Sequence, residues 1–430
     1  MSSSLKNLAP YIRGLSFDGE KGKVVVVDES PIFQTQGLQG FIEALKAKGH
    51  RAPLVIAHIE EDVVAAKASL KKAWETFQAE NNTCPCAILV LNRGAFFLSA
   101  GYDHALASQK FYVNGITAVN AGQQPIVECG CKRHEHGAST QQGACSSQES
   151  KAKDYKSPVS GRIAVVTGGA QGFGEGIVRE LIARDCLVYI ADLNIEGAKK
   201  LAQNLNSEAG KTMALAVAVN IMDESSVQAM MAEIVAVTGG LDLFVANAGV
   251  LKAGSVKEME KKDFDFVTNV NYTGYFLCVK HVSKILALQN EATGKYFSDI
   301  IQINSKSGLE GSNKNGAYAG GKFGGIGLTQ SFALELVTDN IKVNAICPGN
   351  FFDGPLWSDP DRGLFIQYLR TGKVAGAKTV ADVKAFYEAK VPMNRGCYGE
   401  DVAKAIVYAV DQKYETGQAI PVTGGQVMLN

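Results

Sequence analysis

The sequence contains 430 residues, more than one hydrophobic core usually organises, so we expect two domains. Hydrophobic residues make up 46% of the chain and charged residues 20%, which is typical of a soluble globular protein. The 43 Lys and Arg residues equal the 43 Asp and Glu residues in number, so overall charge favours neither nucleic acid nor an anionic membrane as a partner.

We expect no signal for secretion or membrane insertion. Its first residues, MSSSLKNLAPYIRG, lack the apolar stretch of a signal peptide, and no apolar run approaches the roughly 20 residues of a membrane helix. The nine cysteines are odd in number and thinly spread, as expected of reduced thiols. We therefore expect a cytoplasmic protein.

Residues 1–125 are predicted to form a small α/β domain. Short apolar runs rich in β-branched residues occur at 22–28, 53–58 and 86–92, and helical patterns such as GLQGFIEALKAKG and VVAAKASLKKAWETFQ lie between them. This part contains no paired carboxylates, catalytic triad or metal motif. We expect it to have a structural or oligomer-building role.

Residues 126–157 are polar, rich in Ser and Gln and without hydrophobic periodicity, which is typical of a linker. The segment also holds residue types that bind zinc, namely Cys129, Cys131, His134, His136 and Cys145. Their spacing, CxC followed by HxH, matches no zinc finger known to us. We favour the linker and expect no metal.

Residues 158–430 are predicted to form a doubly wound parallel sheet, the Rossmann fold. A strand at IAVVTGG, a helix at GFGEGIVRELIARD and a strand at CLVYIADL begin the series. Further strands follow at MALAVAV, LDLFVAN, IIQIN and IKVNAIC. Repeated strand–helix–strand crossovers imply a parallel sheet with helices on both faces.

The turn TGGAQGFG after the first of these strands suits a dinucleotide. Gly168, Gly172 and Gly174 permit a tight turn in which backbone N–H groups approach a pyrophosphate at a helix N-terminus. Asp192, at the end of the next strand, can accept hydrogen bonds from a ribose 2′-hydroxyl and would repel a 2′-phosphate, which favours NAD over NADP. The alternatives are an ordinary tight turn and a helix-capping Asp192.

The segment NSKSGLEGSNKNGAYAGGKFGG suggests proton-transfer chemistry. A helix from Ala317 onward places Tyr318 and Lys322 on one face, one turn apart. The free phenol has a pKa of about 10, and a neighbouring ammonium group would lower it toward neutrality. Ser305, at the end of the strand IIQIN, is placed to hold a substrate oxygen.

Together these motifs resemble the short-chain dehydrogenase/reductase family. The resemblance rests on TGxxxGxG at 167–174, NAG at 247–249, a Ser thirteen residues before YxxxK, and PG at 348–349, in the family's order. It implies a Rossmann fold, Tyr318 as general acid/base assisted by Lys322, Ser305 and Asn271, and a dimer or tetramer. It also implies cofactor contacts at Gly168, Gln171, Gly172, Phe173, Gly174, Asp192, Asn220, Ile221, Asn247, Ala248, Gly249, Tyr318, Lys322, Pro348 and Gly349.

Several segments resemble those members of the family that interconvert sorbitol 6-phosphate and fructose 6-phosphate. These are IIQINSKSG, YxxxKFGGxGLTQS, the GN at 349–350 and the terminal VTGGQVM. The resemblance suggests Lys306 and Asn350 as substrate contacts, and a phosphate would favour cations such as Lys306. Weaker candidates for the phosphate are Arg362, Arg370 and Lys373.

The segment 351–395 departs from the family pattern. Many relatives carry a Thr five residues after the PG proline, but Asp353 occupies that position, so the cofactor contact usual there is in question. The aromatic residues Trp357, Phe365, Tyr368 and Tyr387 predict a substrate lid.

Other functions are compatible with the same residues. The substrate of a dehydrogenase could be a free polyol or a keto acid instead of a phosphate. The chain could also be a sensor that binds NAD without turnover, with Tyr318 and Lys322 serving only packing and solvation. The complete set of Ser305, Tyr318, Lys322 and Asn271 favours the enzyme, because binding alone needs no proton-transfer group.

Overall fold

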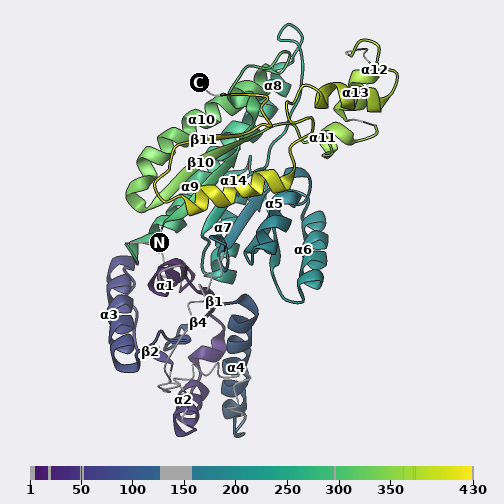
Figure 1. The fold of residues 1–430 in the computed structure, drawn as a ribbon. Helices are drawn as coiled ribbons and strands as arrows, with labels where there is room; N and C mark the ends of the chain where they lie inside the picture. Colours follow the sequence, from purple (N-terminus) through teal and green to yellow (C-terminus); the bar gives the residue numbers. More distant parts are fainter. Residues whose placement is uncertain are drawn as a thin grey trace, which may run out of the picture.

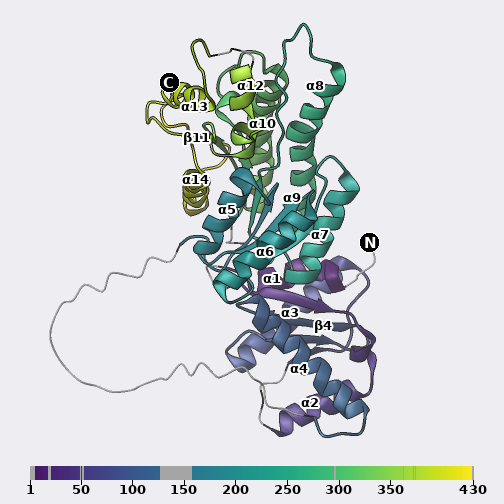
Figure 2. The ribbon, with the colours of Figure 1, turned by 90° about the vertical axis from the view of Figure 1, so that its right-hand side faces the viewer.

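The computed structural model describes residues 5–17, 21–48, 50, 53–125, 157–294, 297–361, 363–370, 372 and 374–428 (Figures 1 and 2). They contain a four-stranded sheet in the order β1-β4-β3-β2 and a seven-stranded sheet in the order β11-β10-β9-β8-β5-β6-β7. Among these residues, no helix is both long and apolar enough to cross a membrane. The linker with Cys129 to Cys145, apart from residue 157, lies outside the described residues, as do Arg362 and Lys373.

The smaller sheet is sandwiched between two pairs of helices. Its strands are β1 (Val24–Asp28), β2 (Leu54–Ile56), β3 (Ala87–Val90) and β4 (Gly94–Ser99). On one face pack α1 (Ala9–Leu15) and α3 (Val63–Asn81), and on the other α2 (Gly37–Ala47) and α4 (Tyr102–Asn120). Short 3₁₀ turns occur at Leu5–Leu8 and Pro31–Gln34. The α/β prediction is therefore confirmed for this part of the chain.

Strand β4 was not predicted from the sequence. This strand pairs antiparallel with both β1 and β3, so only β2 and β3 are parallel neighbours. The turn between β3 and β4 spans three residues, and Asn92 adopts a positive φ of 60° within it. Because the connection is so short, the sequence contains few turn-forming residues that would mark β3 and β4 as two separate strands.

The larger sheet is entirely parallel, which confirms the predicted doubly wound fold. Its strands are β5 (Ile163–Thr167), β6 (Leu187–Asp192), β7 (Ala214–Ala218), β8 (Leu243–Ala246), β9 (Ser298–Ile303), β10 (Ile341–Pro348) and β11 (Ala419–Val422). The strand order reverses between β5 and β8, where such folds open a ligand crevice at the carboxyl ends of the strands.

Helices cover both faces of this sheet. One face packs against α5 (Gly172–Ala183), α6 (Ile195–Ala209) and α14 (Gly399–Asp411). The other packs against α7 (Glu224–Thr238), α9 (Gly274–Glu291) and α10 (Gly316–Leu336), while α8 (Lys261–Thr268) precedes α9. Burial on both faces explains why the central strands are continuous apolar runs.

The segment after β10 has a hydrophobic cluster of its own. It forms α11 (Pro355–Ser358), α12 (Leu364–Arg370) and α13 (Val380–Glu388), packed around Phe352, Trp357, Phe365 and Val383. Both views place these helices at the end of the molecule opposite the smaller sheet (Figures 1 and 2).

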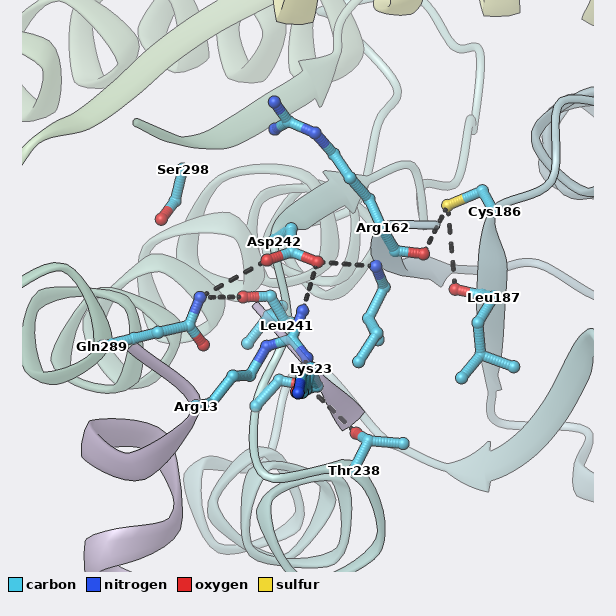
Figure 3. Close-up of polar contacts among 12 residues, drawn as sticks. Arg13, Lys23, Arg162, Cys186, Leu187, Thr238, Leu241, Asp242, Gln289 and Ser298 are labelled. Atoms are coloured by element: carbon cyan, nitrogen blue, oxygen red, sulfur yellow. Dashed lines mark hydrogen bonds and ion pairs between the residues drawn. The ribbon is translucent and has the colours of Figure 1, made fainter. Parts of the chain in front are cut away.

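The N-terminal region is joined to the larger sheet by a buried interface. Helix α1 lies between the two sheets and packs against α9 (Figure 2). A guanidinium nitrogen of Arg13 lies 2.6 Å from a carboxylate oxygen of Asp242, and both side chains are fully buried (Figure 3). The same carboxylate accepts a hydrogen bond from the Ile163 N–H at 2.7 Å. A Cβ atom at Gly14 would lie 2.1 Å from the Gln289 carbonyl oxygen, so only glycine permits this approach.

Candidate active site

The turn between β5 and α5 is shaped by glycine. Gly168 and Gly172 both have φ near 62°, in the left-handed region that disfavours other residues. A Cβ atom at Gly174 would lie 2.0 Å from the Gly168 carbonyl oxygen, whereas one at Gly172 would meet nothing within 4 Å. The turn is therefore tight internally and open at the start of α5, which fits a pyrophosphate at a helix N-terminus.

The side chain of Asn247, directly after the neighbouring strand β8, holds this turn. The Asn247 amide donates to the carbonyl oxygens of Thr167 and Gly168 at 2.9 and 3.1 Å. In return, the Thr167 hydroxyl oxygen accepts from the N–H groups of Asn247 and Ala248, each at 3.1 Å. This role of Thr167 was not predicted from the sequence, although Thr167 stands at the first position of the TGxxxGxG motif.

Asp192 is fixed beside the turn by two backbone hydrogen bonds. One carboxylate oxygen accepts from the Ala170 N–H at 3.0 Å and the other from the Asn194 N–H at 2.9 Å. The side-chain cap of α6 is instead Asn194, whose oxygen accepts from the Gly197 N–H. The alternative interpretation of Asp192 as the cap of that helix is therefore wrong. Its free lone pairs remain available to a ribose.

The other residues predicted to contact a cofactor lie along the same edge of the sheet. Gln171 precedes α5, and the Phe173 ring stacks on Phe351 at a centroid distance of 4.8 Å. Asn220 accepts a hydrogen bond from the Met222 N–H, and Ile221 is buried against Gly274. The remaining positions, Gly249, Pro348 and Gly349, follow β8 or end β10.

Three side chains meet where β9 and α10 approach each other. The Ser305 hydroxyl is hydrogen-bonded to Tyr318 and also accepts from the Ser307 N–H at 3.1 Å. The Lys322 amine donates to the Ile303 carbonyl oxygen at 2.9 Å and lies 5.6 Å from the centre of the Tyr318 ring. The helix begins at Gly316, one residue before the predicted start.

Asn271 lies in a π-helical turn, Asn269–Thr273, between α8 and α9. Its side chain makes a two-way bond with Val250, accepting from the N–H at 2.9 Å and donating to the carbonyl at 2.8 Å. Such turns often mark functional positions. Asn271 and Lys322 both line a cavity of about 10 Å³, roughly the space that one water molecule occupies.

Burial dominates the acid–base properties of this group. It raises the pKa of Tyr318, and the hydrogen bond from Ser305 opposes that rise without cancelling it. Burial also lowers the pKa of Lys322 to about 8. In the chain by itself the Lys322 amine is directed to the Ile303 carbonyl, and the depression of the Tyr318 pKa by Lys322 stays a prediction.

The residues predicted to contact the substrate are less closely grouped than the proposed catalytic residues. Lys306 lies 3.7 Å from Glu310 and keeps about a fifth of its side chain exposed, with a relative area of 21%. The Asn350 carbonyl accepts from the Cys397 N–H, and Arg370 donates to the Asp361 carbonyl. None of these contacts shows a cation directed at Tyr318.

Asp353, at the position that departs from the family pattern, contacts side chains further along the chain. Its carboxylate lies 2.5 Å from the Lys384 amine on α13 and is hydrogen-bonded to Tyr398. Asp353 therefore fastens α13 to the chain leaving β10.

Within the described residues, no group of three or more His, Cys, Asp or Glu side chains could hold a metal ion. The predicted candidates Cys129, Cys131, His134, His136 and Cys145 lie outside that part of the chain.

Comparison with known proteins gives consistent matches for the larger sheet. The family model described as short chain dehydrogenase matches residues 162–356. Sorbitol-6-phosphate 2-dehydrogenase of Escherichia coli (strain K12) is 38% identical over 270 residues, which cover 62% of this chain and 99% of that protein. The crystal structure of sorbitol-6-phosphate 2-dehydrogenase from Erwinia amylovora is 39% identical with a TM-score of 0.57, covering 62% of this chain and 100% of that one. An actinorhodin polyketide ketoreductase solved with NADPH is 26% identical with a TM-score of 0.55, covering 62% and 97%.

Proposed function

Because the chain belongs to the short-chain dehydrogenase/reductase family, we propose that it interconverts a secondary alcohol and a ketone on a polyol phosphate such as sorbitol 6-phosphate, using NAD. The main support for the proposed reaction is that Ser305, Tyr318 and Lys322 lie close together at the carboxyl end of the parallel sheet. The observation that supports the substrate is the similarity to two sorbitol-6-phosphate 2-dehydrogenases over nearly their full length.

In alcohol oxidation, Tyr318 takes the proton of the substrate hydroxyl while the adjacent carbon loses a hydride. Bound NAD supplies the acceptor for that hydride. Ser305 donates a hydrogen bond to the substrate oxygen and so holds it against Tyr318. Lys322 and Asn271 border a small cavity, and a water molecule there would carry the proton onward. Ketone reduction uses the same groups in reverse.

Asp192 supports NAD as the cofactor. Its carboxylate is held by the N–H groups of Ala170 and Asn194, so it cannot easily swing away from a ribose bound beside the turn. A 2′-phosphate at the same place would face this fixed negative charge. We expect kcat/KM for NAD to exceed that for NADP by about tenfold or more, which is 1.4 kcal/mol of differential binding.

We propose Lys306 and Asn350 as substrate contacts. Lys306 directly follows Ser305, and the exposed Glu310 is its ionic partner in the described structure. An incoming phosphate carries more negative charge than Glu310 and would compete for the Lys306 ammonium. A free polyol lacks that group and would not gain from it.

We also propose that the protein is a cytoplasmic homo-oligomer. Four Phe side chains on adjacent helices remain 41–48% exposed, which is unusual for a monomer surface: Phe264, Phe266, Phe276 and Phe323. For the N-terminal region we propose a structural role, supported by the buried contact of Arg13 with Asp242.

A substrate panel tests the proposed function. The purified chain is offered NAD or NADP with sorbitol 6-phosphate, sorbitol, related polyols and their phosphates, and NADH or NADPH formation is followed by absorbance. We expect turnover with NAD and sorbitol 6-phosphate. Turnover of free sorbitol alone would overturn the phosphate proposal, and faster turnover with NADP would overturn the cofactor proposal. Binding of NAD without turnover on any member would favour the sensor.

A further inference from the structure

Asn304 immediately precedes Ser305 and is 3% exposed. It follows β9, and its N–H donates to the Ile346 carbonyl of β10 at 2.7 Å, so the sheet fixes its backbone. A buried amide must find hydrogen-bond partners for both of its ends.

The Asn304 side chain joins the strand that carries Ser305 to the helix that carries Tyr318 and Lys322. Its amide nitrogen donates to the Lys322 carbonyl oxygen of α10 at 2.9 Å and to the Gln302 side-chain oxygen at 2.8 Å. Its amide oxygen accepts from the Ser305 N–H at 2.8 Å. One short side chain thus touches the backbone of two proposed catalytic residues.

Glycines leave room for this arrangement. A Cβ atom at Gly308 would lie 2.1 Å from the Asn304 amide oxygen. One at Gly325 of α10 would lie 2.4 Å from the Gln302 amide nitrogen. Any other residue at either place would force these amide side chains to shift.

The network continues away from the catalytic residues. Gln302 also accepts a longer hydrogen bond from the Thr329 hydroxyl at 3.5 Å, and Thr329 is hydrogen-bonded to Tyr275 at 3.1 Å. Thr329 is fully buried but touches neither Ser305 nor Lys322 by a hydrogen bond in the described structure. It offers a control in the same network at a distance from the chemistry.

We propose that Asn304 is a positioning residue, whose amide holds the backbone at Ser305 in register with α10 so that the Ser305 hydroxyl reaches Tyr318. The proposal rests on the proposed function of Ser305 and Tyr318. Without the amide, the Ser305 N–H and the Lys322 carbonyl lose a shared partner, and the loop leaving β9 is free to shift relative to the helix. A shift of about 1 Å at a catalytic group reduces a rate by up to about a hundredfold.

The test compares Asn304→Ala with Thr329→Val in the full-length chain. We expect Asn304→Ala to lower kcat about ten- to hundredfold while KM for the cofactor stays within about twofold. Because the Ser305 hydrogen bond lowers the Tyr318 pKa, its loss should also move the rising limb of the oxidation pH profile to higher pH. The other titratable groups that influence or adjoin Tyr318 are Cys347 of β10 and Lys322 of its own helix, and neither is altered. Thr329→Val should lower stability without moving that limb.

Equal kcat and pH profiles for the two variants would overturn the proposal. If Asn304→Ala does not fold, Asn304→Asp keeps the shape and the acceptor for Ser305, but it sets a carboxylate against the Gln302 and Lys322 oxygens. The same loss of kcat is then expected.

A crystal structure of the Asn304 variant separates this inference from the proposed function. If the wild type turns over no alcohol, the proposed function fails, and the structure still decides the positioning role. A Ser305 hydroxyl displaced from Tyr318 supports that role, and an unmoved hydroxyl refutes it.

Discussion

The two edges of the seven-stranded sheet bury polar groups in opposite ways. At the amino edge, charges pair with charges: Arg13 with Asp242 at 2.6 Å and Lys342 with Asp299 at 3.0 Å. At the carboxyl edge, the ionisable Tyr318 and Lys322 have neutral partners, a hydroxyl and a backbone carbonyl.

This difference distinguishes charged groups that stabilise the fold from ionisable groups that take part in the proposed reaction. At the amino edge, Arg13 holds the Asp242 carboxylate in its charged form, whereas burial raises the pKa of Asp299 in spite of Lys342. At the carboxyl edge, the neutral partners of Tyr318 and Lys322 leave desolvation as the main cause of their pKa shifts. Thus the pKa of Lys322 falls to about 8, and the Lys322 amine becomes available for proton exchange. Burial alone would raise the pKa of Asp242, but Arg13, Arg162 and the Ile163 N–H hold it below its usual value.

The largest effect on activity is expected at the carboxyl edge. Tyr318→Phe removes the group that exchanges the substrate proton, and general acid–base catalysis contributes about a hundred- to ten-thousandfold in rate. We expect kcat to fall by that range while the dissociation constant for NAD, measured by fluorescence titration, changes little. In the wild type, oxidation should accelerate as pH rises, because Tyr318 must lose its proton and burial raises its pKa. Retained turnover in Tyr318→Phe would refute the assignment of the base.

The largest effect on stability is expected at the amino edge. Arg13→Met leaves the Asp242 carboxylate buried without its closest cation, and breaking such a pair costs about 3–5 kcal/mol. Urea unfolding measures the loss, and the double variant Arg13→Met/Asp242→Asn should recover part of it because no isolated charge remains. Kinetics of the folded protein should keep the wild-type pH profile. A loss below about 1 kcal/mol would show that the pair behaves like an exposed salt bridge.

The pH dependence of this loss has a definite sign. The folded-state pKa of Asp242 is depressed, so its contribution is present above the ordinary carboxyl pKa of about 4 and disappears as pH falls through the folded-state value. The stability difference between the wild type and Arg13→Met should therefore be full at neutral pH and shrink in acid. A difference that grew in acid would contradict this origin.

The sequence predicted the carboxyl edge better than the amino edge. Glycine spacing, Asp192 and the YxxxK pattern are local signals, and the parallel fold brings together the motifs that follow successive strands. The Arg13–Asp242 contact joins residues 229 positions apart, and no local pattern marks either partner. Strand β4 was missed because only a three-residue turn separates it from β3. The role of Asn304 was missed because it depends on the close packing of α10 against the end of β9.

The smallest effect concerns the glycines of α10. From the sequence alone, these glycines predict room for a cofactor or a partner helix, and bulky residues at Gly321 or Gly325 are then expected to disrupt either. Within the described chain, the close neighbours are internal: a Cβ atom at Gly325 would lie 2.4 Å from the Gln302 amide nitrogen, and one at Gly324 would lie 2.8 Å from the Tyr272 ring. At Gly321, a Cβ atom would meet only the Asn271 Cβ, at an ordinary 3.7 Å.

Gly325→Ala and Gly321→Ala therefore form a matched pair on one helix. The first should destabilise the fold by about 1–3 kcal/mol through overpacking and should lower kcat by disturbing the Gln302–Asn304 network. The second should gain up to about 1 kcal/mol from helix propensity, since alanine disfavours the helix less than glycine does. Thermal unfolding and kcat measured on both variants test the difference. If the two variants had the same thermal stability and the same kcat, α10 would be able to shift at Gly325 to make room for a methyl group. The amide network at the carboxyl edge would then be more adaptable than the Arg13–Asp242 ion pair at the amino edge.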